Sequence, residues 1–231
     1  MTKQLLYVLC AFIFLPFTLS AQIDEDQTGA WYMFFWNKPF NNSNFGLQGD
    51  YQFRYWDFGS DQEQLLLRTG LTLENNAKTI KGTLGYGYIR TGAFGESKET
   101  VTESRIYQEA LIPHKISDRF QLTHRFRFEQ RWVEDQDLRI RWRYNLFLNI
   151  PLNNTALTKG TWYLAFYNEI FINGNRDIGD GRSVELFDRN RSYAALGYGL
   201  FTNHRVQLGL MRQTTDGWAK TQMQLSLHSS L

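Results

Sequence analysis

Apolar and polar residues alternate with a period of two along most of the chain, which is typical of β-strands with two different faces. Between residues 45 and 55 the odd positions are mainly aromatic or aliphatic, and the even positions are mainly polar. The alternation is clearest at 120–132 and 138–150, where arginines occupy many of the polar positions. Further candidate strands cover residues 65–74, 80–88, 104–112, 161–172, 190–200, 204–213 and 219–229. Helical spacing is not sustained after the N-terminal region, so we expect an all-β protein.

Strand length and the chemistry of the two faces favour a membrane barrel. Strands of soluble sandwiches usually have about 5 to 6 residues, whereas a tilted strand needs roughly 9 to 11 to cross a bilayer. The polar faces carry too many arginines for a packed core, and tryptophans stand near several strand ends: Trp132, Trp142, Trp162 and Trp218. We therefore predict an antiparallel up-and-down transmembrane β-barrel of ten to twelve strands. A soluble sandwich with its arginines facing water is the alternative.

The predicted connections give the barrel two different ends. The two longest, 91–103 and 173–189, lie on one side if the strands alternate up and down, and the tightest, 75–78 and 202–203, lie on the other. Long outer loops and short periplasmic turns are typical of outer-membrane barrels. Counting from residue 45 gives ten strands with both chain ends periplasmic. The segment GAWYMFFW at 29–36 is apolar on both faces and would be an eleventh strand. An eleventh strand breaks the even count unless the segment is a plug, a periplasmic brace or half of a further hairpin.

The N-terminus is typical of a secretory signal peptide. Lys3 supplies a positive charge, residues 5–15 are almost wholly apolar, and small residues precede a cleavage site after Ala21. This predicts a signal peptide at 1–21 and a single outer-membrane barrel domain at 22–231. An N-terminal membrane anchor is the alternative. The only cysteine, Cys10, would leave with the signal peptide, so the mature chain would have no disulfide.

Composition narrows the class of protein and its partners. Aromatic residues make up 16 % of the 231 residues and the mean hydropathy is −0.44, values that exclude a disordered chain and a bundle of membrane helices. The 25 basic and 23 acidic residues give a formal charge of +2, too little for a general attraction to nucleic acid. The partner we expect is outer-membrane lipid, with no nucleic acid.

Several segments resemble recurring blocks of a known family. They are GAWYMFFW at 29–36, HRFRFEQR at 124–131, RIRWRYNLFLNIPL at 139–152, FYNEIFIN at 166–173 and FDRNRSYAALGYG at 187–199. These blocks are similar to the domain of unknown function 2490, a family of bacterial outer-membrane proteins common in Bacteroidetes. The resemblance implies an outer-membrane β-barrel and supplies no established activity. Many such barrels finish on an aromatic residue that the assembly machinery recognises, whereas this chain ends in Leu231.

No catalytic, cofactor or metal motif accompanies the strand pattern. Phosphate-binding loops, dinucleotide glycine patterns, nucleophile elbows and Cys/His metal spacings are missing from the sequence. The histidines are scattered and none has a second ligand at a useful spacing. Asp180 and Asp188, in the predicted long outer loop, have no histidine beside them. We predict no enzyme site, no cofactor and no metal.

Arginines carry the functional signal. Alternation places thirteen basic and five acidic residues on the inner face, a net charge of +8. The basic residues are Arg54, Arg68, Lys81, Arg105, Arg125, Arg127, Arg131, Arg139, Arg141, Arg143, Arg189, Arg191 and Arg205, and the acidic ones are Asp50, Glu74, Glu109, Glu129 and Glu169. Twelve of them form the predicted lumen charge cluster: Arg105, Glu109, Arg125, Arg127, Glu129, Arg131, Arg139, Arg141, Arg143, Glu169, Arg189 and Arg191.

Two interpretations of this cluster remain open. In a structural barrel, Glu129, Glu109 and Glu169 tie the arginines together and fill the lumen. In a narrow anion-preferring pore or a site for small anionic solutes, the guanidinium groups face water and hold carboxylate or phosphate. An outer-membrane enzyme or ligand-binding barrel with its site at the extracellular rim is the alternative from a different class.

Overall fold

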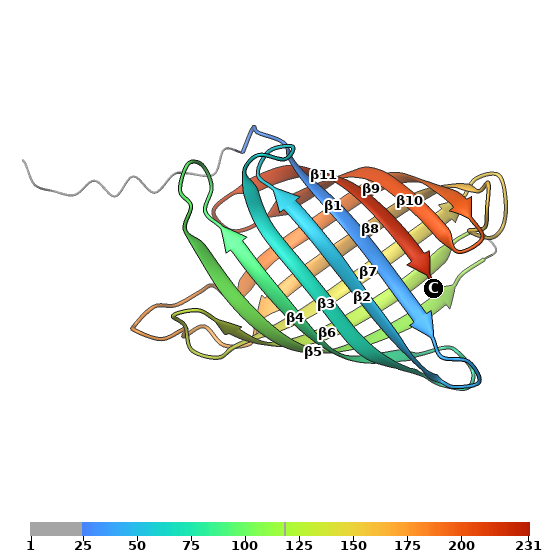
Figure 1. The fold of residues 1–231 in the computed structure, drawn as a ribbon, viewed down its shortest axis with the longest axis horizontal. Coiled ribbons are helices and arrows are strands. Elements are labelled where there is room, and N and C mark those ends of the chain that lie inside the picture. Colours follow the sequence, from blue (N-terminus) through green and yellow to red (C-terminus); the bar gives the residue numbers. More distant parts are fainter. Residues whose placement is uncertain (1–24, 118) are drawn as a thin grey trace, which may run out of the picture.

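The computed structural model describes residues 25–117 and 119–231, and these form a closed barrel of eleven strands (Figure 1). The all-β barrel class is confirmed. The predicted signal peptide at 1–21 lies outside the described residues. The strands are β1 (Gly29–Pro39), β2 (Phe45–Tyr55), β3 (Gln62–Glu74), β4 (Lys81–Gly92), β5 (Thr100–Lys115), β6 (Gln121–Val133), β7 (Arg139–Pro151), β8 (Trp162–Asn173), β9 (Phe187–Phe201), β10 (His204–Thr214) and β11 (Ala219–Ser230).

The barrel closes through one parallel pair, β1 with β11, whereas all other neighbours are antiparallel. Figure 1 shows the two strands side by side. Segment 29–36 is therefore a wall strand, and its interpretation as a plug or brace is wrong. With eleven strands the first and last run in the same direction, so β1 begins at one end of the barrel and β11 finishes at the other. Eleven strands lie within the predicted range of ten to twelve, but the count of ten with both ends on one side is wrong.

The connections divide the barrel into two ends, which we call rim A and rim B. Rim A carries loops 56–61, 93–99, 134–138, 174–186 and 215–218, and rim B carries 40–44, 75–80, 116–120, 152–161 and 202–203. The two connections predicted to be longest do share one end, rim A. Loop 152–161 at rim B is also long, but it turns inward: Thr161 is fully buried and Leu157 packs against the interior cluster around Trp31.

The predicted faces hold along the strands. Apolar side chains point outward and remain exposed, as for Leu84 at 58 % and Phe126 at 49 %, and the outer surface also carries exposed Trp132, Trp142 and Trp162. A soluble monomer rarely leaves so continuous an apolar surface exposed. Among the described residues, no helix is long and apolar enough to cross a membrane.

Two large inward side chains lie over glycines of the neighbouring strand. A Cβ atom added to Gly85 on β4 would overlap the ring of Tyr107 on β5, and one added to Gly197 on β9 would overlap the ring of Tyr163 on β8. Both tyrosines are at most 1 % exposed. These glycines let the two rings lie flat against the inner wall, which leaves the middle of the barrel to the charged side chains.

Candidate functional site

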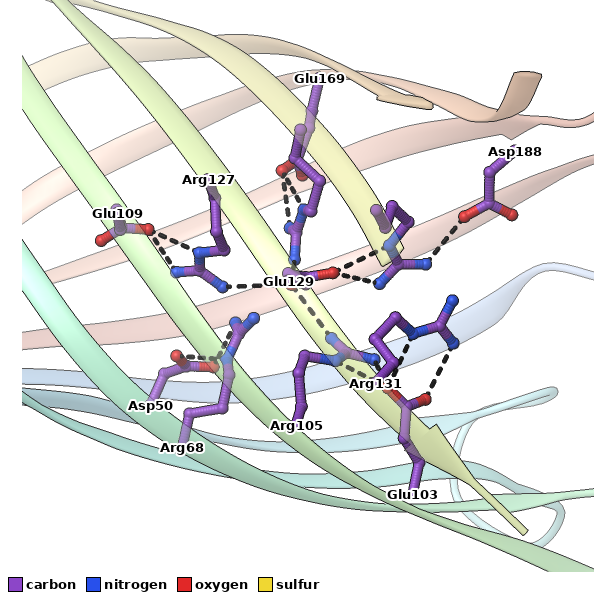
Figure 2. A network of polar contacts seen from close by, with 12 residues as sticks. Asp50, Arg68, Glu103, Arg105, Glu109, Arg127, Glu129, Arg131, Glu169 and Asp188 are labelled. Atoms are coloured by element: carbon purple, nitrogen blue, oxygen red, sulfur yellow. Dashed lines mark hydrogen bonds and ion pairs between the residues drawn. The ribbon is translucent and has the colours of Figure 1, made fainter. Parts of the chain in front are cut away.

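Glu129 on β6 is the centre of a buried ion-pair network (Figure 2). Its side chain is fully buried. Oε2 accepts hydrogen bonds from Arg141 Nε at 2.8 Å and Nη2 at 2.7 Å. Oε1 accepts from Arg143 Nη1 at 2.7 Å and Arg105 Nη1 at 3.2 Å. One carboxylate thus holds three guanidinium groups from β5 and β7, in the manner of a structural ladder.

Two further acids extend the network toward rim B. Glu169 Oε1 accepts hydrogen bonds from Arg143 at 2.9 and 2.6 Å and from Arg125 Nη2 at 2.6 Å. Glu109 accepts from Arg127 Nε at 2.7 Å, with a second contact to Nη2 of the same arginine. Glu109, Glu129 and Glu169, the three acids of the predicted cluster, therefore each bind at least one of its arginines.

Toward rim A the network includes acids that sequence reasoning missed. Glu103 accepts hydrogen bonds from Arg105 Nε at 2.8 Å and from Arg131 Nε at 2.8 Å and Nη2 at 2.9 Å. Asp188, expected in an outer loop, accepts one from Arg141 Nη1 at 2.8 Å. Glu63 accepts one from the Trp31 Nε1–H at 2.8 Å. These three carboxylates make the lumen less positive than alternation predicts.

Register irregularities and strand length explain the omissions. The pairing slips between Arg54 and Tyr55 opposite Glu63, and again between Phe171 and Ile172 opposite Asp188, so each acid is the extra residue of a bulge and turns inward against the alternation. Glu103 was assigned to a connection, but β5 begins at residue 100. A bulge leaves little signal in one sequence, whereas the longer β5 could have been traced by its alternation.

The lumen is closed to solvent at the level of Glu129 and on toward rim A. The inward side chains of Glu129, Phe171, Gln213 and Gln222 are at most 1 % exposed. Between these and rim A, Leu66, Ile89, Trp56, Lys220 and Ile178 are also buried. A water-filled passage would expose the residues along it, so this half of the barrel is a packed interior.

The other half of the lumen contains a cavity of about 500 Å³ that opens at rim B. Its lining reaches the exposed rim residues Thr202 and Asn203, whereas Glu129 and the loops of rim A do not line it. Its inner end is formed by Trp31 together with Arg54, Arg191 and other charged side chains. We call this cavity the cup.

Three arginines of the cup lack an acidic partner. Arg54, Arg191 and Arg205 all line the cavity, and none has a carboxylate oxygen of the described residues within 4.0 Å. The Arg54 nitrogens donate to the amide oxygens of Gln52 and Gln64 at 2.6 to 3.1 Å. These three guanidinium groups are therefore less neutralised than those around Glu129. The other arginines that line the cavity are paired with Asp50, Glu109 or Glu169, and they are Arg68, Arg125, Arg127 and Arg143.

All twelve residues of the predicted cluster lie on the inner wall, but they do not form one site. Arg139 and Arg189 belong to the rim A side, where Arg139 donates to Gln136 Oε1 at 3.2 Å and Arg189 to Asp188 Oδ1 at 3.0 Å. His124 points outward and contacts the Tyr144 hydroxyl at 2.9 Å. No group of metal ligands occurs among residues 25–117 and 119–231.

Comparison with known proteins places the chain in a family. The model of a family described as protein of unknown function (DUF2490) matches residues 28–224, which include the barrel from Gly29 to Gln224 on β11. The chain belongs to DUF2490. No curated protein and no solved structure matches it. For this member of DUF2490, function must be argued from the lumen itself.

Proposed function

We propose that this DUF2490 protein is a bacterial outer-membrane barrel that is closed across its middle and binds small anions in the cup. The observation that carries the proposal is the contrast between the two halves of the lumen. Arg105, Arg141 and Arg143 each have a carboxylate oxygen of Glu129 within 4.0 Å. Arg54, Arg191 and Arg205 line the cavity without a carboxylate oxygen of the described residues at that distance. The arginine-rich lumen is thus a structural closure in one half and a binding site in the other.

The outer surface supports a location in the outer membrane. Exposed leucines and aromatic rings surround the barrel, in the arrangement that a lipid-facing band requires. Because rim A carries the longest loop, 174–186, we orient rim A outward and the mouth of the cup toward the periplasm.

Electrostatics supports an anionic ligand. A guanidinium group that is removed from water and left without a counter-charge costs several kcal/mol on the order of magnitude given for ion desolvation. An anion in the cup would offset this cost, and arginine binds carboxylate or phosphate through two parallel hydrogen bonds. The closed layer argues against conduction, because an ion leaving the cup toward rim A would meet packed side chains.

Planar-bilayer recording of the purified protein tests the closure. We expect no step conductance above that of protein-free bilayers. Stable steps with a reversal potential that shifts in a KCl gradient would overturn the closed-barrel proposal and support the anion-preferring pore. Titration calorimetry with inorganic phosphate and acetate, at low and high salt, tests anion binding separately. We expect heat that diminishes with salt.

Location and orientation are tested on cells. The protein should fractionate with the outer membrane and migrate on gels in a heat-modifiable way, and recovery as a soluble periplasmic protein would contradict the proposal. Single cysteines can then mark the rims, since Cys10 is the only native cysteine. Gly181→Cys at rim A should react with a membrane-impermeant maleimide in whole cells, and Thr202→Cys at rim B should react only after lysis.

A further inference from the structure

We propose that the ligand of the cup is a small amphipathic acid, with its anionic group at Arg54 and Arg191 and an apolar body extending toward rim B. This proposal rests on the proposed function and adds the substrate class and its orientation. It stands on two features of the cup: a paired arginine site at its inner end, and an apolar wall between that site and the mouth.

Trp31 holds the two arginines at the inner end. The Cζ atom of Arg54 lies 3.8 Å from the centroid of the Trp31 ring, and that of Arg191 lies 4.8 Å from it. The ring itself is 2 % exposed and fixed by its hydrogen bond to Glu63. Two cations that contact one indole lie close together and repel one another. The Glu63 carboxylate attracts both but has no oxygen within 4.0 Å of either guanidinium group, and one negative charge does not offset two positive ones, so the pair favours a further anion.

Arg191 has hydrogen-bonding capacity left for that anion. Its Nε donates to Gln213 Oε1 at 2.7 Å, and its Nη1 and Nη2 have no hydrogen-bond partner among the described residues. Arg191 lines the cavity. Tyr193, two residues further along β9, also lines the cavity. A carboxylate or phosphate at this end of the cavity would accept hydrogen bonds from Nη1 and Nη2 of Arg191.

An apolar wall continues from this point toward rim B. Met33 on β1, Leu157 of the inward loop and Ala165 on β8 line the cavity and pack in the cluster that contains Trp31. Phe35 lines the cavity one step nearer the mouth and stacks on His228 at 4.8 Å between ring centroids. A small inorganic anion would leave this wall in contact with water, whereas an apolar chain or ring would cover it.

The size of the cup fits such a molecule. A cavity of about 500 Å³ lies within the range of roughly 300 to 1,000 Å³ that is typical of small-molecule sites. The wall and the arginines face the same space, so the acid group reaches Arg191 while the body remains between Met33 and Leu157. We therefore expect short fatty acids or aryl-alkanoic acids to bind more tightly than their small hydrophilic counterparts.

The test is titration calorimetry of the protein in nanodiscs of zwitterionic lipid, with empty nanodiscs subtracted. The probes are acetate, butanoate, hexanoate, octanoate and inorganic phosphate. We expect affinity to rise up to about fourfold per methylene from butanoate to octanoate, the limit for complete burial of each added group. Octanol should not compete with octanoate for the cup, because it lacks the anionic group.

Variants separate the anionic site from the apolar wall. Arg191→Gln should weaken octanoate about tenfold or more, since it removes a charge-assisted hydrogen bond, and Arg191→Lys should recover part of the affinity by restoring the charge. Leu157→Asn should flatten the dependence on chain length and leave acetate binding unchanged. Arg212→Gln is the matched control, because Arg212 is exposed on the outer face and bonds to Thr221.

The outcomes distinguish the two proposals. If phosphate and acetate bind as tightly as octanoate and still depend on Arg191, the anion-binding cup stands and the amphipathic ligand is wrong. If no acid binds to the folded parent, the proposed function itself fails. Equal weakening by Arg191→Gln and Arg212→Gln would also overturn the assigned site, with heat-modifiable migration confirming that both variants fold.

Discussion

Replacement of Glu129 by glutamine tests whether the arginine network holds the barrel together. The substitution preserves the shape of the side chain but removes the charge that faces Arg105, Arg141 and Arg143. Loss of one partner from a buried ion pair costs about 3 to 5 kcal/mol. Each of these arginines keeps a second carboxylate, from Glu103, Asp188 or Glu169. We therefore expect a loss near the lower limit, about 3 kcal/mol.

The assay is reversible urea unfolding in lipid vesicles, followed by tryptophan fluorescence and by heat-modifiable migration. Glu185→Gln is the matched control, because Glu185 pairs with Arg176 at 3.3 Å while their side chains are 66 % and 60 % exposed. An exposed pair contributes at most about 1 kcal/mol. Equal losses for Glu129→Gln and Glu185→Gln would refute the reasoning, because they would mean that the guanidinium groups around Glu129 are hydrated. If these groups are hydrated, Glu129→Gln should also conduct ions in planar bilayers, with an increased preference for anions.

Three further predictions concern the inner wall, the outer face and a rim A loop. Gly85→Ala should destabilise the barrel by about 1 to 3 kcal/mol, since its Cβ would overlap a tyrosine ring, whereas Gly59→Ala, with open space around it, should be neutral in the same urea assay. Phe126→Arg should cost about 2 to 4 kcal/mol if it lies at mid-bilayer depth, and Ile116→Arg in a rim B loop should be tolerated; equal tolerance would show that the lipid face is misassigned. Burial acts to raise the pKa of Asp57, but hydrogen bonds from a serine hydroxyl and three backbone N–H groups outweigh it and hold the pKa below its ordinary value of 3.8. The stabilisation that the ionised Asp57 gives to loop 56–61 should therefore be present above pH 3.8 and be lost only as the pH falls through the lowered pKa. Hydrogen exchange of the loop amides measures this stabilisation, and a loss of protection already near pH 5 would contradict the assignment.

Local alternation was enough to predict the faces. On a pleated strand successive side chains point to opposite sides, so the inward position of Arg127, Glu129 and Arg131 follows from their spacing alone. The same rule placed Phe126 and Phe128 outside. Strand length then distinguished a barrel from a small sandwich, because the extent of an alternating segment is also a local property of the sequence.

The candidate site could be predicted only in part, because its chemistry depends on which acid meets which arginine. Alternation placed Arg54 and Arg191 inside, but not beside the same indole ring, since the three side chains come from β2, β9 and β1. The inward turn of Glu63 and Asp188 arises from slips in pairing with neighbouring strands. Such slips depend on contacts between segments and leave little trace in either segment alone.

The sequence by itself determined the β class, the faces and the basic lumen, because each depends on residues a few positions apart on one strand. Only the tertiary structure decided the number of strands and the division of the lumen. Segment 29–36 is apolar on both faces, and what makes it a wall strand is its parallel pairing with β11, at the opposite end of the described chain. The closed layer and the cup likewise arise from side chains that meet across the barrel, where distances are set by closure and register rather than by sequence spacing.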